Sequence, residues 1–365
     1  MRFGYWAWLS AIILALVLGV VLLYAYRANV PPASQVPATL AIGSPTASVV
    51  DVPLPGADRF ALVVDRGCSP PGPPPYVRRE DKNEVIATLG PAYLCQFHGA
   101  TSPDGRRLAY WLFESGRSEI ALYQAGASTT VVRLGEELVF EVVWSSDGTG
   151  LLYVAMKGGV QGVPPEYAAL RTVDLATGTI RELSRETGRY LTPLAWDRAR
   201  RLTAASVTPA SGGAGEYLTV TEDRVIARHA PQPDVILQRA SPDAAFMVAA
   251  RTGGALLYWP IASFADQKAL LPEAGTFAGI AAWRPGAREL AVVVTDGGSQ
   301  RIELWSLDGK RRRLVDFSGQ RGGLFFRPDG SALFIGGGLA VDVATGRATH
   351  IALVGSEGAA ASVLR

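Results

Sequence analysis

The sequence predicts an all-β protein, a seven-bladed β-propeller that follows one N-terminal membrane-spanning helix. Three observations predict this architecture. A turn signature recurs six times at a spacing near 43 residues, the length of a four-stranded propeller blade. The 365 residues include 40 Gly and 24 Pro, which favours many turns, and 48% of the residues are apolar, which is enough for a large core. Near the N-terminus, residues 3–26 carry no charge.

Residues 3–26 predict a transmembrane helix and so a membrane partner for the chain. About 20 apolar residues cross the hydrocarbon core of a bilayer as a helix, and this segment is long enough. Aromatic residues at both ends resemble an interfacial belt, namely Tyr5, Trp6, Trp8, Tyr24 and Tyr26. A cleaved signal peptide is the alternative, but its apolar region usually spans about 7–15 residues and no small-x-small site follows the segment. We therefore expect an uncleaved anchor over residues 1–27.

The orientation of the anchor depends mainly on the cysteines, because Arg2 before it and Arg27 after it give a weak charge bias. Cys68 and Cys95 are the two cysteines, and such a pair in an exported chain is typical of a disulfide. That bond would stabilise the fold by roughly 3–4 kcal/mol. Two free thiols in a cytosolic protein are the alternative. We expect a single-pass protein of the cell membrane, with its N-terminus in the cytoplasm and the propeller outside.

Residues 28–57 predict an extended stalk, and we place the propeller at residues 58–365. The stalk contains six prolines among Ser, Thr and Ala, and no charge occurs before Asp51, so it cannot bury enough surface to fold. Without Arg2 and Arg27 the chain has 33 basic and 33 acidic side chains. This balance provides no field to attract nucleic acid, and we expect no nucleic-acid partner.

The repeated signature is clearest at residues 101–108, Thr-Ser-Pro-Asp-Gly-Arg-Arg-Leu, where an apolar strand follows. Five further copies begin at Trp144, Trp196, Ala240, Trp283 and Phe326. Equivalent positions are separated by 43, 51, 45, 43 and 43 residues. One blade has two apolar faces, so it must stack against neighbours, and a closed ring covers them all.

Each signature combines the residues of a tight turn. Pro presets φ, Asp accepts hydrogen bonds from nearby amides, and Gly supplies a positive φ. We expect a structural role, closing their own turns, for the aspartates Asp104, Asp147, Asp243 and Asp329. A ring of carboxylates that binds a cation is the alternative. Arg198 and Gly286 occupy the equivalent positions in the other two copies and would interrupt such a ring.

The number of blades depends on both ends of the propeller. Residues 60–64 and 85–89, with Tyr76 and Val77 between them, predict three strands of a blade that lacks its first strand. Residues 361–364 could supply that strand and close the ring. Seven blades follow, and six blades with a decorated extension are the alternative.

The signature Ser102-Pro103-Asp104-Gly105, followed by two residues and an apolar strand, resembles the WD40-like repeat of TolB-type propellers. The same repeat occurs in the propellers of prolyl oligopeptidase relatives. The resemblance covers residues 98–353 and implies a propeller. TolB also has an amino-terminal α/β domain, which this sequence lacks, so a role in the Tol–Pal system is not implied.

Groups suited to catalysis are scarce. No Gly-x-Ser-x-Gly motif occurs, and no second domain follows the propeller, so we expect no oligopeptidase activity. The three histidines are His98, His229 and His350, and they lack the spacing of metal ligands. We expect structural or surface roles for them, with no catalytic residue, no metal and no cofactor.

Three segments are candidates for contacts with a partner. Residues 310–313, Lys-Arg-Arg-Arg, would blunt the edge of an outer strand, and an anionic partner is the alternative. Insertions at residues 157–167 and between Cys68 and Cys95 lengthen loops, where binding residues usually lie. We expect a protein- or ligand-binding, scaffolding module of the cell envelope rather than an enzyme. The alternative is a lyase or a metal-dependent hydrolase that uses the channel mouth.

Overall fold

The computed structural model describes residues 55–65, 74–82, 84–90, 99–114, 117–159, 163–211, 215–222, 225–229, 235–251, 255–270, 272, 275–317, 323–335, 338–351 and 359–365. The chain divides into two units, residues 1–46 and 47–365, and the described residues all belong to the second. The predicted membrane helix, most of the predicted stalk, Cys68, Cys95 and His98 lie outside the described residues. Within those ranges, no helix has the length and apolar character needed to cross a membrane.

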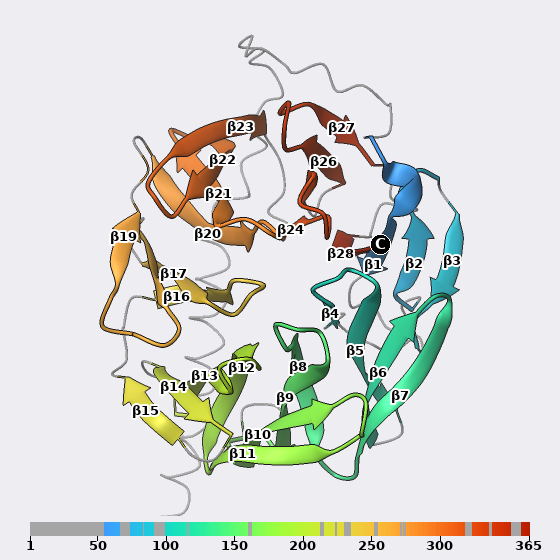
Figure 1. Ribbon diagram of the computed structural model, residues 1–365, viewed down its shortest axis with the longest axis vertical. Coiled ribbons are helices and arrows are strands. Elements are labelled where there is room, and N and C mark those ends of the chain that lie inside the picture. The colour runs from blue at the N-terminus through green and yellow to red at the C-terminus, as the bar shows by residue number, and fades with distance from the viewer. Residues whose placement is uncertain are drawn as a thin grey trace, which may run out of the picture. The chain divides into compact units, whose positions relative to one another are not determined.

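Seven four-stranded antiparallel sheets form a ring, and in six of them the strands follow one another in chain order from the axis outward (Figure 1). Blades 1 to 3 consist of β4 (Gly99–Thr101), β5 (Arg107–Glu114), β6 (Arg117–Gln124) and β7 (Ala127–Leu134); β8 (Leu138–Trp144), β9 (Gly150–Gly158), β10 (Pro165–Asp174) and β11 (Ile180–Glu186); and β12 (Arg189–Asp197), β13 (Leu202–Pro209), β14 (Glu216–Thr221) and β15 (Val225–His229).

Blades 4 to 6 consist of β16 (Val235–Ala240), β17 (Phe246–Arg251), β18 (Ala255–Pro260) and β19 (Lys268–Leu270); β20 (Thr276–Trp283), β21 (Glu289–Asp296), β22 (Ser299–Ser306) and β23 (Arg311–Phe317); and β24 (Leu324–Phe326), β25 (Ala332–Ile335), β26 (Leu339–Asp342) and β27 (Ala348–His350). The closing blade consists of β28 (Ala359–Leu364), β1 (Ala61–Asp65), β2 (Tyr76–Arg79) and β3 (Val85–Thr88), and the 3-10 turn η1 (Ala57–Arg59) precedes β1.

The closing blade joins the end of the chain to its beginning. Strand β28 pairs antiparallel with β1, with Leu364 opposite Ala61 and Val363 opposite Leu62. It takes the innermost place in a sheet whose other three strands precede blade 1 in the sequence. The prediction that residues 361–364 complete the first blade is therefore confirmed. The ring has seven blades, and the six-bladed alternative is excluded.

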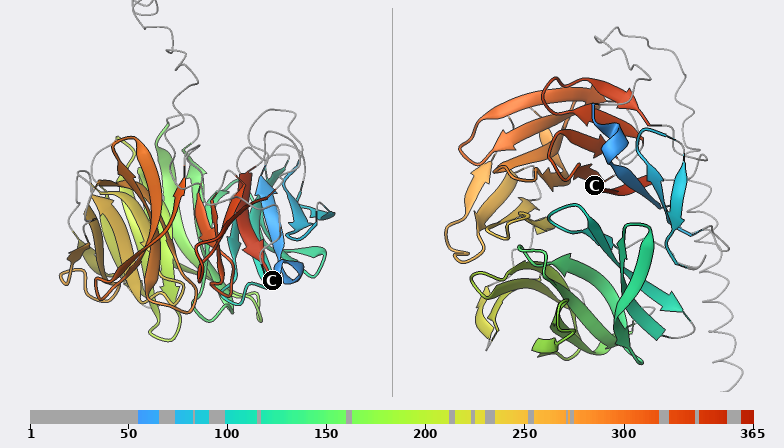
Figure 2. Two further views of the ribbon diagram at one scale, coloured as in Figure 1. Left: turned by 90° about the horizontal axis from the view of Figure 1, so that it is seen from above. Right: turned by 45° about the vertical axis from the view of Figure 1, so that its right-hand side comes forward.

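Apolar side chains fill the seams between neighbouring blades, whose strands lie face to face when the ring is seen edge-on (Figure 2). Between blades 2 and 3, for example, Leu152 and Leu170 pack with Val207 and Leu218, all fully buried. Full burial of one such side chain stabilises the fold by about 1.5–3 kcal/mol. Stability therefore resides in the contacts between blades, so each blade depends on its neighbours.

A tryptophan at the end of an inner strand packs against the preceding blade. Trp144 of β8 belongs to the same cluster as Ala109 and Ile120 of blade 1. Trp196 of β12 covers Gly150 of blade 2, where a Cβ atom would lie 2.5 Å from the indole ring. The aromatic residue that opens most copies of the signature thus fixes one blade on the next.

Candidate functional site

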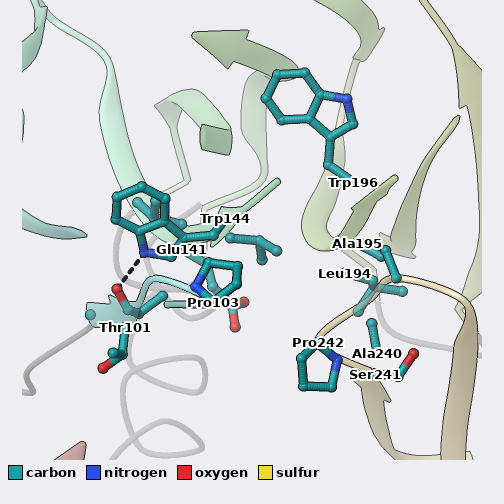
Figure 3. Close-up of a pocket in the computed structure, with 15 residues that line it drawn as sticks. Thr101, Pro103, Glu141, Trp144, Leu194, Ala195, Trp196, Ala240, Ser241 and Pro242 are labelled. Carbon is teal, nitrogen blue, oxygen red and sulfur yellow. Dashed lines mark hydrogen bonds between the residues drawn. The ribbon is translucent and has the colours of Figure 1, made fainter. Parts of the chain in front are cut away.

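A pocket with a volume of about 560 Å³ lies where the inner strands β4, β8, β12 and β16 end. We call it the axial pocket. Four consecutive blades contribute to it, together with the turns that follow β4 and β16. Figure 3 shows Pro103, Glu141 and Trp144 on one side of it and Leu194 and Pro242 on the other. A volume of about 300–1,000 Å³ is usual for ligand sites in proteins.

Trp144 forms one wall, and two contacts hold its indole. The ring Nε1–H donates to the carbonyl of Ala100 over 2.6 Å. The guanidinium of Arg107 lies 4.8 Å from the ring centroid. Arg107 is itself held by a 2.7 Å hydrogen bond from Nη2 to the carbonyl of Gly148. A cation over an indole face is attracted by the ring quadrupole. The hydrogen bond and the cation–π contact therefore hold the Trp144 ring in place within the protein itself.

Trp196 also lines the pocket, and 4% of it is exposed. Its Nε1–H is buried and has no hydrogen-bond partner among the described residues. A buried donor without a partner typically costs about 1–3 kcal/mol. The unpaired donor is therefore a cost of packing Trp196 into the seam between blades 2 and 3, because its nitrogen has almost no exposed surface.

The polar side chains of the pocket, Thr101, Glu141 and Ser241, all interact within the protein. Ser241 is occupied by its own turn, because its Oγ–H donates to Asp243 Oδ1 over 2.5 Å and the same oxygen accepts the amide N–H of Phe246 over 2.9 Å. Glu141 is half-buried on β8 and is the one ionisable side chain among the 15 described residues that line the pocket. The chemistry of the pocket is therefore that of one carboxylate among apolar and aromatic walls.

The four aspartates singled out from the sequence lie on the turns between the first and second strands of their blades. In each, Oδ1 accepts from the turn itself: in Asp147 from Ser145 Oγ over 2.7 Å and from the Thr149 amide over 3.0 Å. Asp104 and Asp243 make the corresponding bonds, and Asp329 accepts from the amide and the hydroxyl of Ser331. Burial would raise the pKa of Asp147, but these hydrogen bonds outweigh it and hold the pKa below its ordinary value.

The two departures from this pattern behave differently. Arg198 replaces the aspartate in blade 3 and donates from Nη2 to Asp174 of the neighbouring blade. Its Nε also lies 3.9 Å from Asp147 Oδ2. Gly286 keeps the turn with a φ of 70° and brings no carboxylate. Among the described residues, no group of three or more His, Cys, Asp or Glu side chains is placed to hold a metal ion.

Two histidines fall within the described part of the chain. His229 on β15 stacks on Phe264 with ring centroids 4.5 Å apart, and burial lowers its pKa. His350 is exposed at the end of β27. The structure therefore places His229 in an aromatic contact between blades 3 and 4 and leaves His350 on the surface.

The basic cluster at residues 310–313 lies at the outermost strand of blade 5, as predicted. Its charges are engaged within the protein. Lys310 Nζ lies 2.8 Å from Asp308, Arg313 pairs with Asp316, and Arg312 Nη2 donates to the Val343 carbonyl over 2.6 Å. These contacts favour the structural interpretation of the cluster.

The insertion at residues 157–167 extends the hairpin between β9 and β10. Tyr167 donates from its hydroxyl to Glu137 Oε1 over 2.8 Å, and Arg171 binds the same carboxylate through 2.6 and 2.8 Å hydrogen bonds. Arg185 lies 4.0 Å from the centroid of the Tyr167 ring. The far end of the insertion is thus tied to its own blade.

Sequence reasoning missed the axial pocket. In the sequence, Trp144 and Trp196 mark only the ends of strands, and Glu141 is part of a strand. A signal is present, because Glu141 interrupts the apolar run Val139, Phe140, Val142 and Val143. An acidic residue in an inner strand departs from the apolar pattern, because burial of a charge is unfavourable unless it has a partner, and Glu141 does interact within the protein.

No family profile matches the sequence, and no curated protein matches it. Among solved structures, TolB from Acinetobacter baumannii is 15% identical with a TM-score of 0.47, covering 71% of this chain and 64% of TolB. An oligogalacturonate lyase in complex with manganese is 15% identical with a TM-score of 0.52, covering 72% of this chain and 79% of the lyase. A putative dipeptidyl aminopeptidase IV from Bacteroides ovatus is 11% identical with a TM-score of 0.48, covering 76% and 49%.

The chain spans less than two thirds of the length of TolB and about half that of the peptidase. At 15% identity and a TM-score of 0.52 the likeness to the lyase concerns the fold alone, and the order of the sheets shows that this protein is a seven-bladed propeller.

Proposed function

We propose that the protein is a membrane-tethered propeller that stands outside the cytoplasm and binds a protein or peptide segment of the cell envelope in the axial pocket. The observation that carries the proposal is the pocket itself. It is built by the inner strands of four blades, so the sheets hold its walls in place. Its apolar and aromatic walls suit the side chains of a peptide, as in most protein sites for small ligands.

The tether is supported by the sequence. Residues 3–26 are uncharged and long enough to span a bilayer, and residues 28–57 are rich in proline. A stalk of this kind would keep the ring away from the bilayer surface. The expected disulfide between Cys68 and Cys95 is what favours partners from the envelope over partners from the cytoplasm.

Photo-crosslinking in membranes tests the proposal. The photoreactive residue p-benzoylphenylalanine replaces Pro242, which is exposed at the rim of the pocket. A control places it at Thr129, exposed on the outermost strand β7 of blade 1. We expect a crosslinked protein partner from the rim position and not from the control. Equal crosslinking from both positions, or none from the rim, would show that the pocket does not bind a protein partner.

The competing hypothesis is an enzyme that uses the channel mouth, either a lyase or a metal-dependent hydrolase. A metal-dependent enzyme would retain its ion through gentle purification. Elemental analysis of the full chain, extracted in mild detergent without chelators, therefore separates the two hypotheses. A stoichiometric metal ion would favour the enzyme, and a specific crosslink from Pro242 without one favours the binding module.

A further inference from the structure

The outermost strand of the closing blade has an uncharged, apolar edge. Strand β3 consists of Val85, Ile86, Ala87 and Thr88, and within the described part of the chain it has a neighbouring strand, β2, on one side alone. The register with β2 shifts at Ile86, and Val85 and Ile86 are 47% and 45% exposed. Proteins usually charge or cover such an edge, because its unpaired N–H and C=O groups otherwise pair with other chains.

The other outer strands show how this ring protects its edges. Five of them contain Lys, Arg, Asp or Glu, namely β7, β11, β15, β19 and β23. Strand β27 contains none of these, but its Ala348 and Thr349 are each 3% exposed. Strand β3 contains none either, and three of its four residues are exposed. Among the described outer strands, β3 is therefore the one that is neither charged nor buried.

The chain that precedes the described residues joins the propeller beside this edge. Arg79, the last residue of β2, donates from Nη2 to the carbonyl of Asp58 in η1 over 3.5 Å. The amide of Glu80 donates to the carbonyl of Phe60, directly after η1, over 2.9 Å. The hairpin that leads from β2 into β3 thus lies against η1 (Figure 1), and the first described residue, Pro55, comes two residues before η1.

The residues before Pro55 have the composition of a strand. Residues 47–54 belong to the same unit of the chain as the propeller and read Ala-Ser-Val-Val-Asp-Val-Pro-Leu. Within them, residues 49–52 contain three valines and no proline, whereas the earlier part of the predicted stalk contains Pro31, Pro32, Pro37 and Pro45. Because β-branched residues are enriched in strands, residues 49–52 favour an extended, paired conformation.

The free edge of β3 is within reach of this segment, and its direction is suitable. A strand beyond β3 would lie three strand spacings from β1, roughly 14 Å. Residues 49–52 are three to six positions from Pro55, which span up to roughly 10–20 Å of extended chain. A chain that arrives at Pro55 runs toward the hairpin end of β3, and β3 runs away from that end. The two would therefore pair antiparallel, as the neighbouring strands of this blade do.

We propose that residues 49–52 pair with β3 as a fifth, antiparallel strand of the closing blade, so that the protein covers its own apolar edge. Main-chain hydrogen bonds hold the added strand, and its valines contact Val85 and Ile86 across the pair. The stalk is then limited to residues 28–46. This inference is independent of the axial pocket and of what binds there.

Photo-crosslinking within the full chain in detergent tests the contact. p-Benzoylphenylalanine replaces Ile86, and mass spectrometry maps the peptide to which it attaches. The matched control places it at Ile180, which is 47% exposed and opens β11, the outermost strand of blade 2. We expect a crosslink from position 86 to a peptide that contains residues 49–52, and no such crosslink from position 180.

A mixture of isotopically heavy and light protein shows whether the crosslink lies within one chain. A crosslink that joins heavy to light peptides would overturn the inference, because a second copy would then cover the edge. Attachment of position 86 to another protein, or the absence of a crosslink to residues 49–52, would overturn it as well.

Hydrogen exchange provides a second readout. Val50→Pro removes a backbone N–H that the added strand needs, and Val36→Pro makes the same change earlier in the stalk. Neither position lies in the seven four-stranded sheets. Val50→Pro should speed exchange of the β3 amides by about tenfold, as the loss of roughly one hydrogen bond implies, and Val36→Pro should not. Equal exchange in the two variants, or protection of β3 that falls on dilution, would contradict pairing within the chain.

Discussion

The guanidinium of Arg327 and the carboxylate of Glu80 form a buried ion pair, although 247 residues separate them in the sequence. Their side chains are 1% and 3% exposed, and Arg327 Nε donates to Glu80 Oε2 over 2.9 Å. Arg327 Nη1 also donates to the carbonyl of Pro55 over 2.7 Å. Arg327 follows the inner strand of blade 6 and Glu80 follows β2 of the closing blade, so the pair locks the two ends of the propeller together.

Removal of Arg327 should destabilise the ring strongly. Arg327→Met leaves the Glu80 carboxylate buried without its partner, which typically costs about 3–5 kcal/mol. The double variant with Glu80→Leu should recover much of this loss, because it removes the stranded charge. Urea unfolding of the purified chain measures both effects.

The control for this experiment is Arg313→Met. Arg313 pairs with Asp316, but their side chains are 63% and 44% exposed, and such surface pairs contribute about 0–1 kcal/mol. A loss for Arg327→Met no larger than that for the control would contradict a structural role of the buried pair.

The ring and its closure were predictable because the signals are local. Each turn signature lies within eight residues, and the aspartate bonds to atoms two positions away, as Asp147 does with Ser145. The pair of Arg327 and Glu80 could not be predicted in this way. Arg327 stands where Ser145 stands in blade 2, a visible departure, but its partner comes from the far end of the chain.

The axial pocket escaped prediction for the same reason. Glu141, Leu194 and Pro242 come from three different blades, and only the ring brings them together. Their separate positions carry no spacing that identifies a ligand. A sequence can therefore indicate an unusual residue, such as an acid in an inner strand, before it indicates what that residue faces.

The turns of blades 1 and 6 touch at Gly105 and Pro328. A substitution at Gly105 therefore tests how the ring closes. Gly105 has a φ of 73°, and a Cβ atom there would lie 2.3 Å from Cβ and Cγ of Pro328. Its carbonyl also accepts the amide N–H of Arg365 over 2.6 Å. Gly105→Ala should therefore lower the free energy of unfolding in two ways. An alanine at this positive φ costs about 1–2 kcal/mol, and the clash of its Cβ atom with Pro328 costs about 1–3 kcal/mol more.

Gly126→Ala isolates the first of these costs. Gly126 has a φ of 88° on the hairpin between β6 and β7, and no atom lies within 4 Å of the position that a Cβ atom would take there. Chemical denaturation of both variants should show the larger loss for Gly105→Ala. Equal losses would mean that the two turns do not touch as the structure has them.

Acid should weaken the contact between blades 2 and 3. The hydrogen bond from Arg198, aided by Thr177, lowers the pKa of Asp174 to about 2 from an ordinary value of 3.8. A carboxyl whose pKa is lowered by folding contributes stability above its ordinary pKa and loses it as the pH falls through the folded value. The contribution of Asp174 should therefore disappear between about pH 4 and pH 2.

Thermal unfolding across this range checks the sign. Asp174→Asn should melt below the wild type near neutral pH, and the difference should shrink as the pH falls toward about 2. Asp266→Asn, at an exposed position between β18 and β19, is the control for the same substitution outside the contact between blades 2 and 3. A difference that stays constant with pH would contradict the role of the Arg198 bond.

Strands β1 and β3, which precede Cys68 and Cys95 in the sequence, finish at the same end of the closing blade. Val64 near the end of β1 lies opposite Tyr76 of β2, and Tyr76 lies opposite Thr88 at the end of β3. Cys68 follows the first of these strands and Cys95 the last, so a disulfide would tie the two connections together.

Protein isolated from membranes with thiols blocked should yield a Cys68–Cys95 peptide by mass spectrometry. Reduction should then cost roughly 3–4 kcal/mol, a loss absent from a Cys68→Ser and Cys95→Ser double variant. Recovery of both thiols in alkylated form before reduction would show that they are free, and would remove the main argument that the propeller lies outside the cytoplasm.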